Sequence, residues 1–286
     1  MKNPVLVECP RDAMQGHKHW IPTPSKIKYI QSLLSVGFDV LDVGSFVSAK
    51  AIPQLADTAQ VISKLNFSES KSKLLVIVAN KRGAEEAAHF DEITYLGFPF
   101  SISETFQKKN INSDIKNSLK RLEEVQNVCE RNNKKLVTYF SMAFGNPYGD
   151  KWSPEILADW VEKLIEGAGV DILSLSDTIG TSKPDSIKWL FEYVIPNFPE
   201  VEIGAHLHTT PDTWKEKIAA AVESGCKRFD GAIKGFGGCP MATDDLTGNM
   251  ATENIISYLN ENNIEHGLNE KAFSDALIMS LEIFPN

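Results

Sequence analysis

The stretch Val201-Glu-Ile-Gly-Ala-His-Leu-His208 joins a short apolar run to two histidines at its end. A run of this kind is typical of a buried strand in a parallel sheet. Helical patterns flank it at Lys183–Val194 and Thr213–Ser224, so we expect it to lie in a βαβ unit. Polar residues directly after a buried strand indicate the sheet edge at which barrel enzymes carry their active sites.

The same alternation extends along the rest of the chain. Strands are predicted at Val5–Cys9, Phe38–Val43, Leu74–Val78, Glu92–Gly97, Lys135–Ser141, Asp171–Ser176, Val201–His206 and Arg228–Ala232. Helices are predicted at Pro24–Val36, Leu55–Leu65, Ala84–Ala88, Ile115–Asn132, Pro154–Glu166, Lys183–Val194, Thr213–Ser224 and Glu253–Asn260. Thr23 and Ser153 are expected to cap two of these helices. Polar residues gathered after strand ends favour a closed α/β barrel, the TIM (β/α)8 fold, over an open sheet.

The length fits one such barrel. The chain has 286 residues, of which 42% are apolar, and a barrel of this type typically needs about 250 residues. We therefore expect a single TIM-barrel catalytic domain over residues 1–286. Residues 269–286 are expected to form a C-terminal extension with an additional helix at Lys271–Glu282.

Charge and cysteine content disfavour several classes of function. The formal net charge of -9 argues against nucleic acid and anionic membranes, because both partners require clustered Lys and Arg. The four cysteines show no paired short spacing, which favours reduced thiols and a cytoplasmic location. No apolar run approaches the roughly 20 residues of a membrane span, and no targeting segment is recognisable.

The two histidines of the seventh predicted strand suggest a metal site. Residues two apart on a strand face the same side, so His206 and His208 can both point into the barrel mouth. A pair of hydrogen-bonded structural histidines is the alternative. The first strand ends in Arg11-Asp12, which is either a structural ion pair or the source of a carboxylate ligand. Asp12 with two imidazoles suits Mg²⁺ or Mn²⁺, and Zn²⁺ stays possible.

The segment after the eighth strand carries a further candidate. Gly235-Phe-Gly-Gly-Cys-Pro240 is typical of a loop that moves, because glycines permit unusual backbone angles. Cys239 is either a reactive acid/base or a small buried hydrophobe, and its place beside the expected mouth favours reactivity. Asn249 can offer a carbonyl oxygen to a metal or begin the following helix. Asp177 is either a turn residue before a helix or part of the mouth.

Six motifs stand in the order that they have in 3-hydroxy-3-methylglutaryl-CoA lyases. They are Pro10-Arg-Asp-Ala-Met-Gln15, Ser45-Phe-Val-Ser48, Phe106-Gln-Lys-Lys-Asn-Ile-Asn112, Asp177-Thr-Ile-Gly180, His206-Leu-His208 and Gly237-Gly-Cys-Pro240. From Val5 to about Leu268 the sequence resembles this family of metal-dependent barrel lyases and synthases. The resemblance implies cleavage of 3-hydroxy-3-methylglutaryl-CoA (HMG-CoA) to acetyl-CoA and acetoacetate, as in leucine degradation and ketone-body formation.

The resemblance also implies a role for each residue of the mouth. The family's metal ligands match Asp12, His206, His208 and Asn249, and Mg²⁺ or Mn²⁺ is the expected cofactor. Arg11 matches the arginine that neutralises the developing enolate, Cys239 matches the proton-transfer thiol, and Asp42 falls where the family has a glutamate near the metal. The residues expected to bind an acyl-CoA substrate are Gln15, Ser45, Asp177 and Lys18, the last as a candidate for the CoA phosphates.

Several positions depart from the family pattern. Asp42 is one methylene shorter than the family's glutamate, and Thr209 and Pro211 replace its usual residues after the second histidine. These changes leave the acyl substrate open. The alternatives are a related aldolase or a condensing synthase acting on a different hydroxy acid or hydroxyacyl-CoA, and a barrel protein that binds without catalysis. We further expect a homodimer, for which the terminal helix could supply a subunit face.

Overall fold

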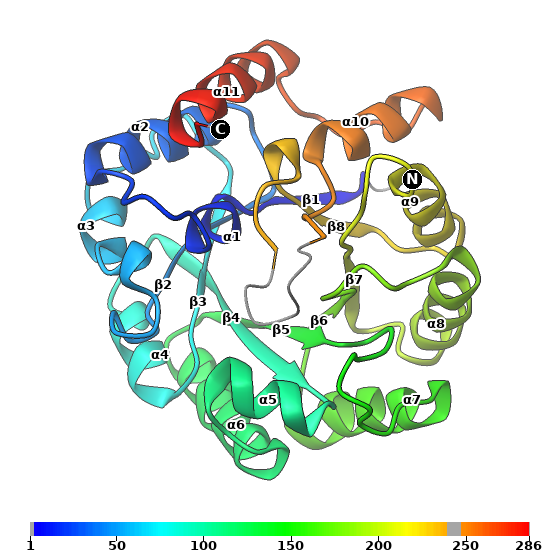
Figure 1. Ribbon diagram of the computed structural model, residues 1–286. Coiled ribbons are helices and arrows are strands. Elements are labelled where there is room, and N and C mark those ends of the chain that lie inside the picture. The colour runs from blue at the N-terminus through cyan, green and yellow to red at the C-terminus, as the bar shows by residue number, and fades with distance from the viewer. Residues whose placement is uncertain (1–2, 239–246, 286) are drawn as a thin grey trace.

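Eight parallel strands close into a barrel in the order of the chain (Figure 1). The computed structural model describes residues 3–238 and 247–285. The strands are β1 (Val5–Glu8), β2 (Val40–Ser45), β3 (Lys73–Ile77), β4 (Ile93–Ser101), β5 (Lys135–Ser141), β6 (Ile172–Ser176), β7 (Glu202–His206) and β8 (Arg228–Gly231). The last strand pairs with the first, Val5 lying opposite Arg228. The expected TIM barrel is therefore confirmed.

Helices surround the barrel (Figure 1). They are α1 (Pro10–Gln15), α2 (Thr23–Leu34), α3 (Thr58–Ile62), α4 (Lys81–Ala88), α5 (Glu104–Ile111), α6 (Ile115–Arg131), α7 (Pro154–Glu162), α8 (Pro184–Asn197), α9 (Trp214–Glu223), α10 (Thr252–Glu261) and α11 (Glu270–Ile283). The 3₁₀ turns η1 (Pro53–Leu55) and η3 (Ile233–Gly235) and the π turn η2 (Lys163–Gly167) complete the set. The predicted additional C-terminal helix is α11, which packs against α2.

Helix starts follow the local sequence. Ser153 caps α7, as expected, because its hydroxyl accepts a hydrogen bond from the Ile156 amide. The expected cap at Thr23 is wrong, since Thr23 is the first helical residue of α2. Its hydroxyl donates instead to Asp57, over a distance of 2.7 Å.

Several segments differ from the predicted elements. Strand β4 continues through Pro99 to Ser101, although a proline normally argues against a central strand because it has no amide to donate. Helix α5 was not predicted, and its start is fixed by Ser103, which caps the Phe106 amide. The single helix expected over Leu55–Leu65 is divided into η1 and α3.

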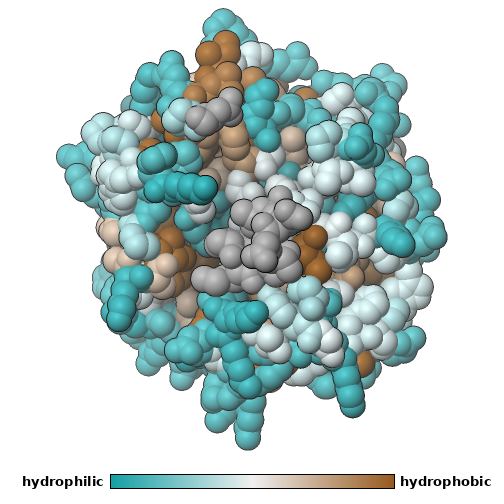
Figure 2. Space-filling model, viewed as in Figure 1, coloured by the Kyte–Doolittle hydropathy of each residue, from teal (hydrophilic) through white to brown (hydrophobic). Residues whose placement is uncertain are grey.

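The apolar core has two layers. A small cluster fills the barrel interior and includes Val7, Val40, Leu75 and Val137. A larger cluster lies between the strands and the surrounding helices. Figure 2 shows hydrophilic residues over most of the face that carries the barrel mouth. No helix within the described residues is long and apolar enough to cross a bilayer.

Candidate active site

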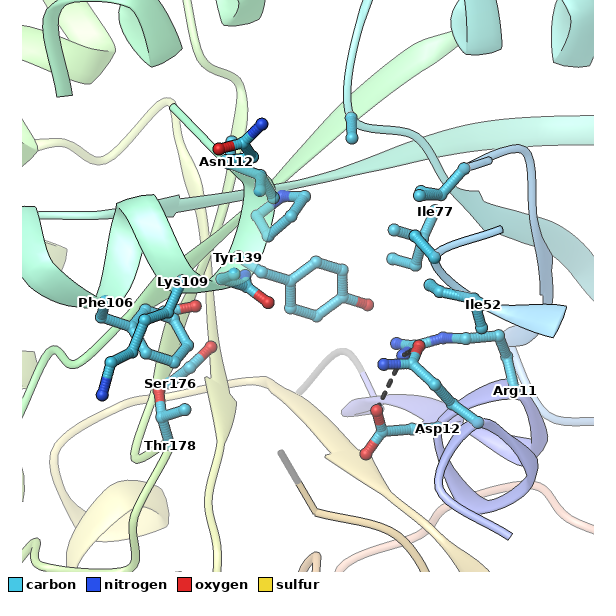
Figure 3. A pocket seen from close by; sticks show the side chains of 18 of the residues that line it. Arg11, Asp12, Ile52, Ile77, Phe106, Lys109, Asn112, Tyr139, Ser176 and Thr178 are labelled. Atoms are coloured by element: carbon cyan, nitrogen blue, oxygen red, sulfur yellow. Dashed lines mark hydrogen bonds and ion pairs between the residues drawn. The ribbon is translucent and has the colours of Figure 1, made fainter. Parts of the chain in front are cut away.

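A cavity of about 460 Å³ opens at the carboxyl ends of the strands (Figure 3). Its floor and walls combine ionisable with apolar side chains, among them Arg11, Asp12, Tyr139, His206 and His208. Figure 3 shows the Tyr139 hydroxyl pointing across the cavity toward the side of Arg11. Arg11, Asp12, His206 and His208, which the sequence placed at the mouth, therefore line one cavity.

Helix α1 presents Arg11 and Asp12 to this cavity. The sequence placed both residues at the end of a strand, but the chain turns into a helix at once because Pro10, at the first helical position, suits a helix start. Arg11 Nε and Nη2 donate to Asp42 Oδ2 over 2.8 and 2.6 Å. Its Nη1 donates to Asp12 Oδ1 over 2.7 Å and to Gln15 Oε1 over 3.0 Å. The guanidinium is thus held rigidly at the cavity wall.

The two carboxylates beside Arg11 titrate differently. Burial alone would raise the pKa of Asp12, but Arg11 and the neighbouring histidines lower this pKa to about 2. In Asp42 burial outweighs the attraction of Arg11 and raises the pKa to about 6. Both groups are therefore ionised above neutral pH, and the positive charge of Arg11 lies between them.

Asp12, His206, His208 and Asn249 come together on one side of the cavity. Asn249 Nδ2 donates to Asp12 Oδ2 over 2.6 Å, and the two imidazole centroids lie 5.5 Å apart. Backbone pairing between His208 and Asn249 connects the segment after β7 to the segment before α10. Burial lowers the pKa of His208 to about 4, so its ring is neutral at physiological pH.

Two polar atoms of this group are buried without a hydrogen-bond partner in the described part of the chain. They are Asn249 Oδ1 and His208 Nδ1. Buried polar atoms are normally paired, so each such atom calls for an explanation. As the residues stand, no three His, Cys, Asp or Glu side chains among those described are arranged to hold a metal by themselves. The amide oxygen of Asn249 is a further donor that an ion at this place could use.

The residues predicted to bind substrate do not all line the cavity. Gln15 lines the cavity. Lys18 lines an adjoining hollow of about 410 Å³ that shares Gln15 with the cavity. Ser45 and Asp177 are buried and absent from the cavity lining: Ser45 Oγ accepts from the Val47 amide, and Asp177 pairs with Lys217 over 2.8 Å. Cys239 lies outside the described residues.

Sequence reasoning missed four residues of this region. Asp230 on β8 lies beside His206, with 3.2 Å between its Oδ2 and His206 Nδ1. Tyr139, Lys109 and Arg121 line the cavity. Asp230 lies within the eighth predicted strand, two residues after its start, so an acid inside a strand was the signal available for it. Lys109 lies within the Phe106–Asn112 motif, whereas Tyr139 and Arg121 have no local motif and only the fold brings them to the cavity.

A closed parallel barrel with ionisable residues at its carboxyl end defines a TIM-barrel enzyme site. The particular family follows from comparison with known proteins. The model of the family described as HMGL-like matches residues 6–279. The chain belongs to this family.

Named relatives cover nearly the whole chain. A hydroxymethylglutaryl-CoA lyase of Bacillus subtilis is 35% identical over 268 residues, which are 93% of this chain and 88% of that protein. A Pseudomonas aeruginosa protein is named 3-hydroxy-3-isohexenylglutaryl-CoA/hydroxy-methylglutaryl-CoA lyase. It is 32% identical over 272 residues, which are 95% of this chain and 89% of that protein. The crystal structure of the Bacillus subtilis HMG-CoA lyase matches this structure with a TM-score of 0.92 and 32% sequence identity. The match covers 100% of this chain and 96% of the chain in the crystal.

Proposed function

We propose that this protein cleaves HMG-CoA to acetyl-CoA and acetoacetate. The observation that carries the proposal is Arg11, which is fixed at the cavity wall beside Asp12, His206 and Asn249. Membership of the HMGL-like family and relatives named HMG-CoA lyase support the same activity.

Asp12, His206, His208 and Asn249 are proposed to hold a divalent metal, with Mg²⁺ or Mn²⁺ preferred. The donor set fits such an ion because it offers an ionised carboxylate, a neutral imidazole and a buried amide oxygen that has no hydrogen-bond partner among the described residues. When bound, a divalent ion supplies Lewis acidity that lowers the pKa of a substrate hydroxyl.

Cations and apolar side chains of the cavity and of the adjoining hollow suit the two ends of an acyl-CoA. Lys109 and Arg121 line its wall, and Lys18 lies in the adjoining hollow. We propose that these cations receive the anionic parts of CoA, as a lysine or arginine can at a site of local positive charge. Apolar side chains, among them Ile52 and Ile77, line the same cavity and suit the carbon chain of the acyl group.

The reaction breaks one carbon–carbon bond. A base takes the proton of the 3-hydroxyl, C3 becomes the ketone of acetoacetate, and the electrons of the C2–C3 bond form the enolate of acetyl-CoA. Four of the five N–H groups of Arg11 are used within the described residues, which leaves one N–H of Nη2 for the enolate oxygen. Cys239 is proposed to return a proton to C2.

The direction of the reaction provides the test. We would incubate the protein with HMG-CoA and, separately, with acetyl-CoA and a set of 2-oxo acids, and measure acetoacetate and free CoA. The proposal predicts acetoacetate from HMG-CoA. Release of CoA only in the second mixture would instead identify a condensing synthase, and turnover of neither would favour a non-CoA hydroxy acid or a binding protein.

Three further expectations stay predictions. The exposed Ile278 and Leu281 of α11 are compatible with a homodimer, whose mass light scattering would measure. A cytoplasmic location and a role in leucine degradation or ketone-body formation are tested by fractionation of cells and by growth on leucine after deletion.

A further inference from the structure

A line of polar side chains, buried beyond its first member, runs through the barrel interior behind the mouth. It begins at Glu202 on β7, whose Oε1 accepts from Arg228 Nη1 over 2.6 Å. Arg228 Nε lies 3.9 Å from Asp230 Oδ1, and Asp230 Oδ2 lies 3.2 Å from His206 Nδ1. The line therefore connects the opposite end of the barrel to a residue of the cavity.

The barrel is built to hold this line. Glu202 is 43% exposed on its side chain, whereas Arg228 and Asp230 are 1% and 0% exposed. A Cβ at Gly204 would lie 2.8 Å from Arg228 Cδ, so the absence of a side chain there provides the space for the arginine. A buried carboxylate is costly unless it is paired or hydrogen-bonded, so the nearby arginine offsets the burial of Asp230.

Strand register places Asp230 beside His206. The two residues are partners in the β7–β8 pairing, and Ser174 from β6 donates to the same Asp230 oxygen over 3.1 Å. A carboxylate can only accept from the ring, so the proton of a neutral His206 is on Nδ1. The lone pair is then on Nε2, the nitrogen that remains for the cavity.

We propose that Asp230 is a positioning residue that fixes the tautomer and ring orientation of His206 for metal binding, with Arg228 compensating its charge. A hydrogen bond from the second nitrogen of a ligating histidine to a carboxylate orients the ring and raises its basicity, and loss of such a partner typically costs about 10–100-fold in metal affinity. This inference rests on the proposed metal site.

The test uses Asp230→Asn, which keeps the size of the side chain and removes its charge. Binding of Mn²⁺ to the otherwise intact protein is measured by calorimetry, beside Glu202→Gln as a matched control that leaves Asp230 and His206 in place. We expect the affinity of Asp230→Asn to fall about 10–100-fold and that of Glu202→Gln to stay within about twofold. Equal affinity of Asp230→Asn and the wild type would overturn the inference.

A second measurement does not depend on whether Asp230→Asn folds. The ¹⁵N spectrum of the metal-free wild type, recorded above neutral pH and compared with His206→Gln to identify the resonances, distinguishes the protonated ring nitrogen. We expect the proton on Nδ1 of His206; a proton on Nε2 would contradict the inference. If wild type bound no Mn²⁺ while Nδ1 carried the proton, the proposed metal site would fail and the role of Asp230 in setting the tautomer would stand.

Discussion

Two buried ion pairs at the mouth of this barrel have opposite characters. Lys217 donates to Asp177, to the Gly180 carbonyl and to the His208 carbonyl over 2.8, 3.0 and 2.9 Å, which uses all three of its hydrogens. Arg11 pairs with Asp42, yet it faces the cavity, and Asp42 Oδ1 has no hydrogen-bond partner among the described residues. An ion pair whose cation has used all its hydrogens within the protein can only hold the fold together. An ion pair that faces a cavity and keeps an N–H group unused can also bind a ligand.

Lys217→Met should have the largest effect on folding. It leaves the buried Asp177 charge without its cation, which typically costs roughly 3–5 kcal/mol. Urea unfolding of this variant and of Asp177→Asn combined with Lys217→Met measures the loss. We expect the double variant to regain much of the stability, and a single variant as stable as wild type would mean that the pair is not what fixes this region.

Arg11→Ala should remove most of the activity, and it also leaves the buried Asp42 carboxylate without its cation, so some stability is lost as well. Loss of one positioned donor to a developing oxyanion typically lowers kcat about 10²–10³-fold. Steady-state kinetics with HMG-CoA, together with a thermal melt, separate the two effects. An unchanged kcat would show that Arg11 is a structural partner like Lys217, and the contrast between the two pairs would disappear.

Glu8 extends the comparison to a buried carboxylate that no cation pairs with in the described part of the chain. Burial raises its pKa to about 8, although Thr252 and the Ile233 amide hydrogen-bond it. The folded protein therefore keeps a proton that the unfolded chain releases above about pH 4.5. Its stabilising contribution is full below that pH and is lost as the pH rises toward 8 and beyond.

Glu8→Gln should remove this pH dependence, because the amide stays neutral. The free energy of unfolding of the variant minus that of wild type should increase by a few kcal/mol from about pH 5 to about pH 9, since one pKa unit corresponds to about 1.4 kcal/mol. Urea unfolding at a series of pH values measures the difference. Parallel stability curves for the two proteins would show that Glu8 is ionised in the folded state.

Asp42→Glu should have the smallest effect on catalysis. It introduces the longer side chain that the family has and keeps the charge beside Arg11. We therefore expect kcat/KM to stay within about tenfold of wild type, which corresponds to a change of about 1.4 kcal/mol in activation free energy. Some stability should be lost, because an extra methylene in a packed interior typically costs roughly 1–3 kcal/mol. A loss of activity as large as that of Arg11→Ala would instead mean that the short side chain sets the position of the arginine.

The sequence predicted the barrel well because every strand and most of the helices have a local pattern. Apolar runs and polar strand ends were enough to place β7 and the mouth residues that follow it. Helix α1 was not predicted, since six residues after a strand give no periodic signal. Strand β4 was ended too early, because Pro99 argues locally for a break that the pairing of β4 with β5 tolerates.

The site was predicted in part for the same reason. His206, His208 and Asp12 could be expected at the mouth from their positions after strands. Asp230 could not be connected to His206 without the register of β7 and β8, which depends on contacts between distant parts of the chain. Asp177 was expected to bind substrate, but its partner Lys217 lies 40 residues away, and that pairing is visible only in the fold.

Metal-dependent cleavage of HMG-CoA tests the central claim most directly. The protein would be treated with a chelator, passed through a desalting column, and assayed for acetoacetate before and after Mg²⁺ or Mn²⁺ is restored. We predict little acetoacetate without the ion and recovery of the full rate when it is added back. Cleavage at the same rate throughout would contradict the proposed role of Asp12, His206, His208 and Asn249.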